Sequence, residues 1–281
     1  MVDAIRQLSR ETDWRETANF AVDFDTFHPQ GFALVDGDLF VSSVEVIEPT
    51  RRYATLQDGM DRSAGTGKGH LFKMDLQGKL LGHIELGEHT AYHPGGIDYD
   101  GTFIWVSVAE YRPDSHSIIY RVDPATMEVQ QVFTTRDHIG GIVHNIDDNT
   151  LHGVSWGARR FYTWPLDDKQ QVDVSDPTPA NNPSHYIDYQ DCMYAGEGMA
   201  VCTGLATYRH QQSVLRLGGI ELVDLRNNRP VHQVAFPFWT TSDKPLTQNP
   251  VTFELEGQTL RMYAMPEDNK SRLFVYESEI E

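Results

Sequence analysis

Histidine and glutamate recur in this chain at a fixed spacing of 17 residues. His28 and Glu45 mark the two ends of one segment, and His93 and Glu110 mark the two ends of another. A third segment begins at His138. Neutral imidazoles with a carboxylate suit a borderline divalent cation such as Zn²⁺, and the same groups perform acid–base catalysis near neutral pH. These residues are therefore the first candidates for a functional site.

The candidate residues belong to a repeated unit. Segments 28–45, 93–110 and 138–156 share a histidine, a short run ending in glycine, a hydrophobic stretch, a turn of Asp, Asn or Gly, and a second hydrophobic stretch. Segments 191–203 and 251–265 repeat the outline more weakly. Short β-rich runs around such turns are typical of β-hairpins, and regular internal repeats indicate a repeat architecture.

A second kind of hairpin completes the unit. Segments 69–84, 118–133 and 219–236 each read as a hairpin with alternating faces. Two hairpins make a four-stranded antiparallel blade, and blades arranged radially form a propeller. We predict that residues 1–281 are a single all-β domain, a five-bladed β-propeller. The segment 19–24 has no blade of its own, so we expect this N-terminal strand to close the last blade.

Propeller geometry brings the repeated residues together. The first residue of an innermost strand and the last residue of its hairpin partner lie at one mouth of the channel. The position of His28, His93 and His138 is taken in the fourth unit by Asp188. We predict these four residues as ligands of a divalent metal of unknown identity. The other predicted site residues are Glu45, Glu110 and Arg112 as catalytic groups, and Trp156, Tyr111 and Arg51 as substrate-binding groups.

Other interpretations of these residues remain open. Without a metal, the histidines and glutamates could act directly as acids and bases. Glu45 and Glu110 could serve glycoside hydrolysis only if their carboxyl groups lie roughly 5–9.5 Å apart. The histidines could also be turn residues that the repeat inherits. The segment 46–68 shows no clear strand pattern, so we expect a long loop that overhangs the mouth.

Composition restricts the class of protein. The hydrophobic fraction is 40%, no stretch approaches the roughly 18 apolar residues of a membrane helix, and the first residues lack an apolar signal core. The 23 basic and 41 acidic residues give a net charge of −18, which repels nucleic acid and anionic lipid. We expect a cytoplasmic protein with a small-molecule ligand and no nucleic-acid or membrane partner.

The two cysteines lie near one predicted turn. If Ala195 pairs with Met199, Cys192 lies directly opposite Cys202. A cross-strand disulfide is geometrically possible there. A reducing cytoplasm favours two buried thiols instead.

Several motifs carry a resemblance to known proteins. They are His28-Pro-Gln-Gly, Ser43-Val-Glu45, Gly69-His-Leu-Phe, His93-Pro-Gly-Gly-Ile-Asp, Ala109-Glu-Tyr-Arg112 and Asp137-His-Ile-Gly-Gly. With these motifs the chain resembles an uncharacterised family of microbial β-propeller proteins with no assigned activity. Its layout is more distantly similar to gluconolactonase and strictosidine-synthase-like propellers, and that similarity implies a divalent cation held in the channel by Glu, Asn and Asp. His28 lies near the first of those places, and this chain has five units where those propellers have six.

These observations favour a metal-assisted hydrolase or lyase that acts on a small polar substrate, sugar derivatives included, at the channel mouth. A non-catalytic module that binds a sugar or peptide through its aromatic rim is the alternative. A scaffold role comes third, because a fold does not fix a function.

Overall fold

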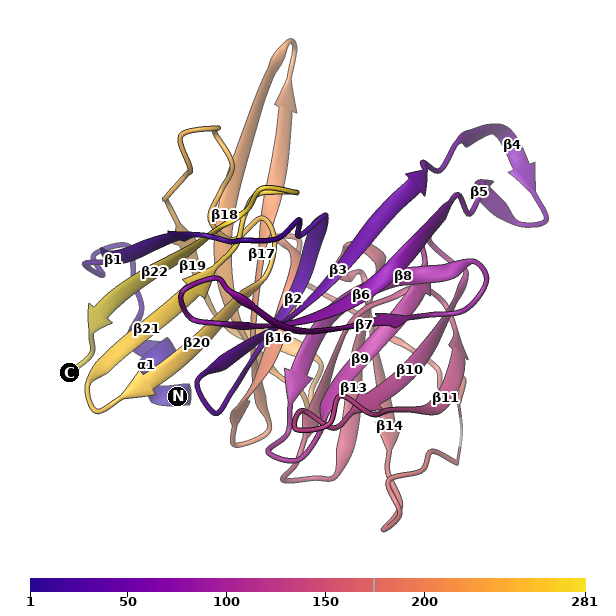
Figure 1. Ribbon diagram of the computed structural model, residues 1–281, viewed down its shortest axis with the longest axis horizontal. Helices are drawn as coiled ribbons and strands as arrows, with labels where there is room; N and C mark the ends of the chain where they lie inside the picture. The colour runs from indigo at the N-terminus through magenta and orange to yellow at the C-terminus, as the bar shows by residue number, and fades with distance from the viewer. Residues whose placement is uncertain (174) are drawn as a thin grey trace.

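The computed structural model describes residues 1–173 and 175–281, and its regular structure is almost entirely β-strand (Figure 1). The helical elements in this part are α1 (Val2–Gln7) and a 3₁₀ helix, η1 (Trp156–Ala158). Neither they nor any other helix among the described residues is long and apolar enough to cross a membrane. The strands are β1 (Arg15–Ala21), β2 (His28–Val35), β3 (Asp38–Glu48), β4 (Arg52–Gln57), β5 (Met60–Arg62), β6 (Thr66–Asp75), β7 (Leu80–Leu86), β8 (Ala91–Tyr99), β9 (Ile104–Glu110), β10 (His116–Val122), β11 (Val129–Arg136), β12 (Ile139–Asn145), β13 (Thr150–Ser155), β14 (Arg160–Pro165), β15 (Ala180–Asn181), β16 (Asp188–Gly196), β17 (Met199–His210), β18 (Ser213–Asp224), β19 (Arg229–Phe236), β20 (Val251–Glu256), β21 (Thr259–Ala264) and β22 (Arg272–Glu279).

The strands form antiparallel units of four. Three units are separate sheets with the orders β2-β3-β6-β7, β16-β17-β18-β19 and β1-β22-β21-β20. The other two, β11-β10-β9-β8 and β12-β13-β14-β15, join into one sheet of eight. They meet through one parallel pair, Gly96 with Gly141. The predicted all-β class and the predicted hairpins are confirmed by these pairings.

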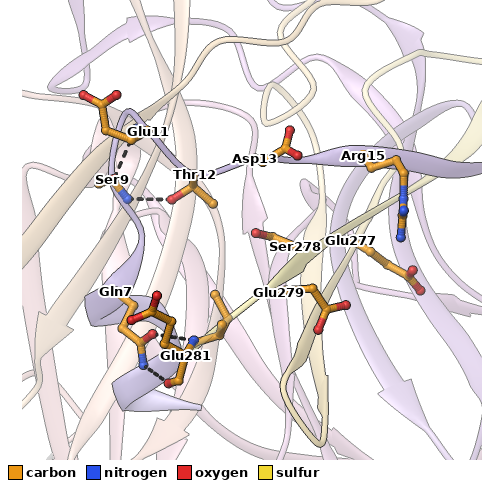
Figure 2. A pocket seen from close by; sticks show the side chains of 11 residues that line it. Gln7, Ser9, Glu11, Thr12, Asp13, Arg15, Glu277, Ser278, Glu279 and Glu281 are labelled. Atoms are coloured by element: carbon orange, nitrogen blue, oxygen red, sulfur yellow. Dashed lines mark hydrogen bonds between the residues drawn. The ribbon is translucent and has the colours of Figure 1, made fainter.

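The N-terminal segment completes the last unit, as predicted. Strand β1 pairs antiparallel with β22, with Asn19 opposite Phe274, although it covers Arg15–Ala21 and so begins earlier than expected. The two ends of the chain lie near one another (Figure 1). The Gln7 side chain holds them there, because its amide donates to the Glu281 carbonyl and accepts the Glu281 N–H (Figure 2).

Glycines of the repeated phrase allow the first strands of the units to approach closely. A Cβ atom on Gly31 would lie 2.6 Å from the Ile97 nitrogen, and one on Gly95 would lie 2.3 Å from the Gly140 carbonyl oxygen. Real Cβ atoms do not approach backbone this closely, so neither position accepts a side chain without movement. The glycines are therefore a packing requirement where β2, β8 and β12 meet.

In the fourth unit a buried aspartate occupies the place of Gly31. The carboxylate of Asp191 accepts the backbone N–H groups of Phe32 at 2.7 Å, Ile97 at 3.2 Å and Cys192 at 3.0 Å. Burial raises the pKa of Asp191, and the three amide donors oppose that effect. One side chain thereby joins β2, β8 and β16 at their crowded meeting point.

Two long hairpins extend beyond the sheets at the upper edge of the view (Figure 1). One is the outer part of β17 and β18. The other is formed by β4 and β5. The predicted long loop at 46–68 is therefore wrong, because β3 extends to Glu48 and β4 and β5 pair as a hairpin within this segment. Most β4 side chains are exposed, so no alternation of polar and apolar residues marks the strand. Its turn uses Asp58 and Gly59, both with positive φ, which is a common hairpin signal.

The cysteines lie directly opposite one another, as predicted, on β16 and β17. A bulge makes Met199 pair with Gly196 and not with Ala195. The preference for free thiols is corrected, because Cys192 and Cys202 form a disulfide with their Cα atoms 4.1 Å apart. Opposed residues on adjacent antiparallel strands come close enough for this bond.

Candidate functional site

A pocket of about 200 Å³ lies where the first strands of four units begin. It contains all four predicted metal ligands and two of the three predicted substrate-binding residues. We call it the mouth pocket. Its lining residues are His28, Gln30, His93, Tyr111, His138, Gly140, Ser155, Trp156, Gly157, Asp188, Tyr189 and Gln190.

A repeated backbone irregularity shapes this pocket. In β2, β12 and β16 the pairing register slips just after the phrase begins, which leaves Gln30, Gly140 and Gln190 as bulged residues. All three line the pocket. Bulges re-aim side chains and are common beside functional sites. The repeated phrase therefore encodes a bend that turns His28 and its equivalents toward a common space.

His28 is oriented by a carboxylate from the last unit. Its Nδ1 lies 2.8 Å from Oδ1 of Asp268, which also accepts from Asn249 Nδ2 at 3.1 Å. Lys244 Nζ lies 3.3 Å from the second oxygen. Burial alone would raise the pKa of Asp268, but the His28 hydrogen bond and the Lys244 charge lower it to about 2. Asp268 is therefore a fixed anion behind His28.

The other two histidines are held neutral by burial. His138 Nδ1 lies 2.7 Å from the backbone carbonyl oxygen of Glu110, and burial lowers the pKa of His138 to about 4. Burial also lowers the pKa of His93 well below its usual range, and the neighbouring His138 and His28 add to that effect. His93 Nδ1 is enclosed without a partner among the described residues.

The Nε2 atoms of all three rings are available to a ligand. Among the hydrogen bonds of the described residues, none involves Nε2 of His28, His93 or His138. These atoms are also not enclosed in the way that His93 Nδ1 is. All three residues line the mouth pocket, and a Cβ atom on Gly140, another lining residue, would lie 3.6 Å from His138 Nε2.

Aromatic rings form one wall of the pocket. Tyr111 lies between His93 and Trp156, with ring centroids 4.2 Å and 5.8 Å away and ring planes tilted by 34° and 36°. Trp156 also meets His138 edge-on at 4.8 Å. The Arg62 guanidinium lies 5.1 Å from the Trp156 ring centroid and ties the end of β5 to this wall. Such a wall suits a ligand with an apolar face.

The predicted catalytic residues lie outside the pocket lining. The buried Glu110 carboxylate accepts from Thr90 Oγ1 at 2.5 Å and from Arg112 Nε, and only the Glu110 carbonyl points to His138. Glu45 lies 3.3 Å from His70 Nε2. The predicted site residues that do not line the pocket are Glu45, Glu110, Arg112 and Arg51.

The predicted metal centre is not supported by the side-chain arrangement. Among the described residues, no group of three or more His, Cys, Asp or Glu side chains is placed to hold a metal ion. Asp188 is instead 3.2 Å from Arg159 Nη2. The four predicted ligands share a pocket without forming a coordination sphere.

Two important neighbours are not singled out by the sequence. Asp268 lies just after the second strand of the last unit, which is where the repeat places mouth residues, so a register argument could have found it. Arg62 carried no such signal, because the hairpin that brings it to Trp156 was expected to be a loop.

A larger pocket of about 480 Å³ lies between the N-terminal segment and the end of β22 (Figure 2). Among the described residues, five carboxylates line it against a single cation, Arg15, and no histidine or aromatic ring takes part. Volume favours this pocket, but the chemistry of the side chains favours the mouth pocket. The carboxylates are Glu11, Asp13, Glu277, Glu279 and Glu281.

The fold and site define an all-β protein of antiparallel four-stranded units with a histidine-rich pocket at the start of its first strands. The chain belongs to the family described as "Family of unknown function (DUF6454)", whose model matches residues 1–281. The expectation of an uncharacterised family is confirmed. No curated protein matches the chain.

Solved structures resemble the chain at low sequence identity. A luciferin-regenerating enzyme is 10% identical with a TM-score of 0.51, and the match covers 95% of each chain. Hydrazine synthase from Kuenenia stuttgartiensis is 13% identical with a TM-score of 0.40 over 90% of this chain, which spans 59% of that one. A DUF4623 family protein from Bacteroides eggerthii is 12% identical with a TM-score of 0.47, and the match covers 96% of this chain and 77% of that one. At these identities the first match concerns the fold alone.

Proposed function

We propose that the five four-stranded units are the blades of a propeller, with the mouth pocket at one end of its channel. The pairing of β1 with β22 supports closure of the last blade. The hydrogen bonds of Asp191 to β2, β8 and β16 support a common axis for the first strands. We include in this proposal the distant similarity of the chain's layout to gluconolactonase and strictosidine-synthase-like propellers.

The mouth pocket binds a small polar molecule. The observation that carries this proposal is that His28, His93 and His138 line one pocket and that none of their Nε2 atoms has a hydrogen-bond partner among the described residues. Polar groups converging beside an aromatic wall are typical of small-ligand sites. The wall of Tyr111 and Trp156 supplies the apolar contact surface.

Tryptophan fluorescence tests this function. The purified protein is titrated with D-glucose, D-mannose, D-galactose, D-glucuronate, D-glucosamine and glycylglycine. We expect at least one probe to change the emission, and we expect Trp156→Phe to abolish the change. Trp239→Phe is the matched control, because Trp239 is 41% exposed and lies outside the pocket lining. No response to any probe, or a response that survives Trp156→Phe, contradicts the proposal.

A metal-assisted hydrolase or lyase is the second candidate. His28 and His138 each direct Nδ1 at an oxygen, which is the outer arrangement common to metal-bound histidines. The test is elemental analysis of protein purified without added metal. Near-stoichiometric metal that is lost in a His28→Ala/His93→Ala variant supports this candidate, and protein free of metal contradicts it.

A further inference from the structure

We infer that the ligand of the mouth pocket is a neutral, hydroxyl-rich molecule, a sugar or polyol, and that carboxylates, phosphates and organic cations are disfavoured. This inference rests on the proposed function and names the chemical class of its ligand. It follows from which atoms in the pocket accept hydrogen bonds and from how its charges are already paired.

His138 presents an acceptor. A backbone carbonyl oxygen can only accept, so the hydrogen of His138 lies on Nδ1, which faces the Glu110 carbonyl at 2.7 Å. Burial lowers the pKa of His138 to about 4, so the ring is neutral and its Nε2 carries the lone pair. A ligand group that meets this atom must donate a hydrogen bond, as a hydroxyl group does.

The charges around the pocket disfavour an oxyanion. Asp188 lines the pocket, and Asp268 lies directly behind His28. The cations nearby already have carboxylate partners. Arg159 bonds to Asp188 at 3.2 Å, and Lys244 bonds to Asp268 at 3.3 Å. The net charge of −18 adds a general repulsion of anions.

An organic cation is disfavoured by Arg62. Aromatic rings attract cations, but the guanidinium of Arg62 already lies 5.1 Å from the Trp156 ring centroid. Its charge also disfavours a positive charge on the adjacent His138. Arg62 is itself paired with Asp61 at 2.8 Å, so its effect is to occupy the cation-binding position on Trp156. A neutral ring with an apolar face can contact Tyr111 and Trp156 without competing for that position.

Gly140 leaves room for a ligand hydroxyl beside His138. A Cβ atom on Gly140 would lie 3.6 Å from His138 Nε2, with no contact closer than that. A methyl group there is sterically tolerated by the protein but occupies the space in front of the acceptor. The next residue, Gly141, does not line the mouth pocket, and its Cβ would meet Val154 at an ordinary 3.4 Å.

The experiment compares neutral and charged relatives of one sugar by isothermal titration calorimetry. We expect D-glucose, D-mannose or D-galactose to bind at least about tenfold more tightly than D-glucuronate, D-glucose 6-phosphate and D-glucosamine, a difference of about 1.4 kcal/mol. Gly140→Ala should weaken the neutral sugar by a similar factor at an unchanged melting temperature. Gly141→Ala, the matched control, should bind like the wild type.

The outcomes separate this inference from the proposed function. Tighter binding of a charged relative overturns the neutral class, although the pocket still binds a small molecule. Equal affinity of the Gly140→Ala and wild-type proteins for the neutral sugar also overturns it. Binding of none of these probes, together with no fluorescence response of Trp156, is the failure of the proposed function itself.

Discussion

Replacing Asp191 by alanine should lower the free energy of unfolding by about 3–5 kcal/mol. The substitution removes the acceptor of three buried N–H groups, on Phe32, Ile97 and Cys192. A buried donor left without a partner costs about 1–3 kcal/mol, so the sum lies at about 3–9 kcal/mol. Relief from burying a carboxylate, which the raised pKa of Asp191 reflects, moves the expected value toward the lower end.

Asparagine at the same position tests the count of hydrogen bonds. Oδ1 of Asp191 accepts from Ile97 and Cys192, whereas Oδ2 accepts, within the part of the chain that the structure describes, from Phe32 alone. An amide can keep the first oxygen, but its NH₂ group then faces the Phe32 N–H. Asp191→Asn should therefore cost about 1–3 kcal/mol, the penalty for one unsatisfied donor.

Equilibrium unfolding in urea measures both variants. Asp75→Ala is the matched control, because its carboxylate also accepts two backbone N–H groups, from Gln77 and Lys79 at 2.9 Å, but in an exposed turn. We expect this control to lose less than about 1 kcal/mol, because water replaces the lost acceptor. The reasoning is refuted if Asp191→Ala stays within about 1 kcal/mol of the wild type, or if both alanine variants lose the same amount.

Three further predictions concern the rest of the molecule. Burial lowers the pKa of His138 and His152 from the usual 6.5 to about 4, so stability present above pH 6.5 is lost as the pH falls toward 4. Each histidine contributes about 3 kcal/mol to this loss of stability. Burial raises the pKa of Asp98 to about 6, so protonation of Asp98 restores a similar amount of stability over part of the same pH range. A urea midpoint that does not decrease when the pH is lowered from 6.5 to 4 contradicts this prediction. Deleting residues 1–25 should lower the melting temperature, because β22 loses its partner strand, and an unchanged value would argue against closure by β1. Glu110→Gln should lower the urea-derived unfolding free energy by about 3 kcal/mol, because it breaks the buried ion pair with Arg112. A variant as stable as the wild type would show that this ion pair does not stabilise the fold.

The repeated phrase was sufficient to predict the hairpins and the gathering of His28, His93 and His138. Each phrase combines a turn signal with hydrophobic runs, and both features act locally, within about 20 residues of chain. The rule that strand ends meet at one mouth then placed Asp188, Tyr111 and Trp156 in the same pocket. Local patterns together with simple topology account for this part of the site.

Side-chain direction and long-range pairing were beyond the sequence pattern. Glu110 ends its strand where expected, but its carboxylate turns to Thr90 and Arg112 and leaves only its carbonyl for His138. Asp268 reaches His28 across 240 residues of chain. Alternation within a strand predicts a face, but it does not predict which of several polar neighbours a buried side chain will choose.

Nitrogen-15 NMR of the histidine rings tests the central claim most directly, because it needs no ligand. We predict that His138 is neutral at pH 7 with its hydrogen on Nδ1, which leaves Nε2 as the acceptor in the mouth pocket. The variant His138→Gln identifies the signals of this ring. Signals of the Nδ1–H tautomer of His138 that shift when a neutral sugar is added support the claim. A His138 ring that carries hydrogen on Nε2, or a proton on both nitrogens, would contradict it.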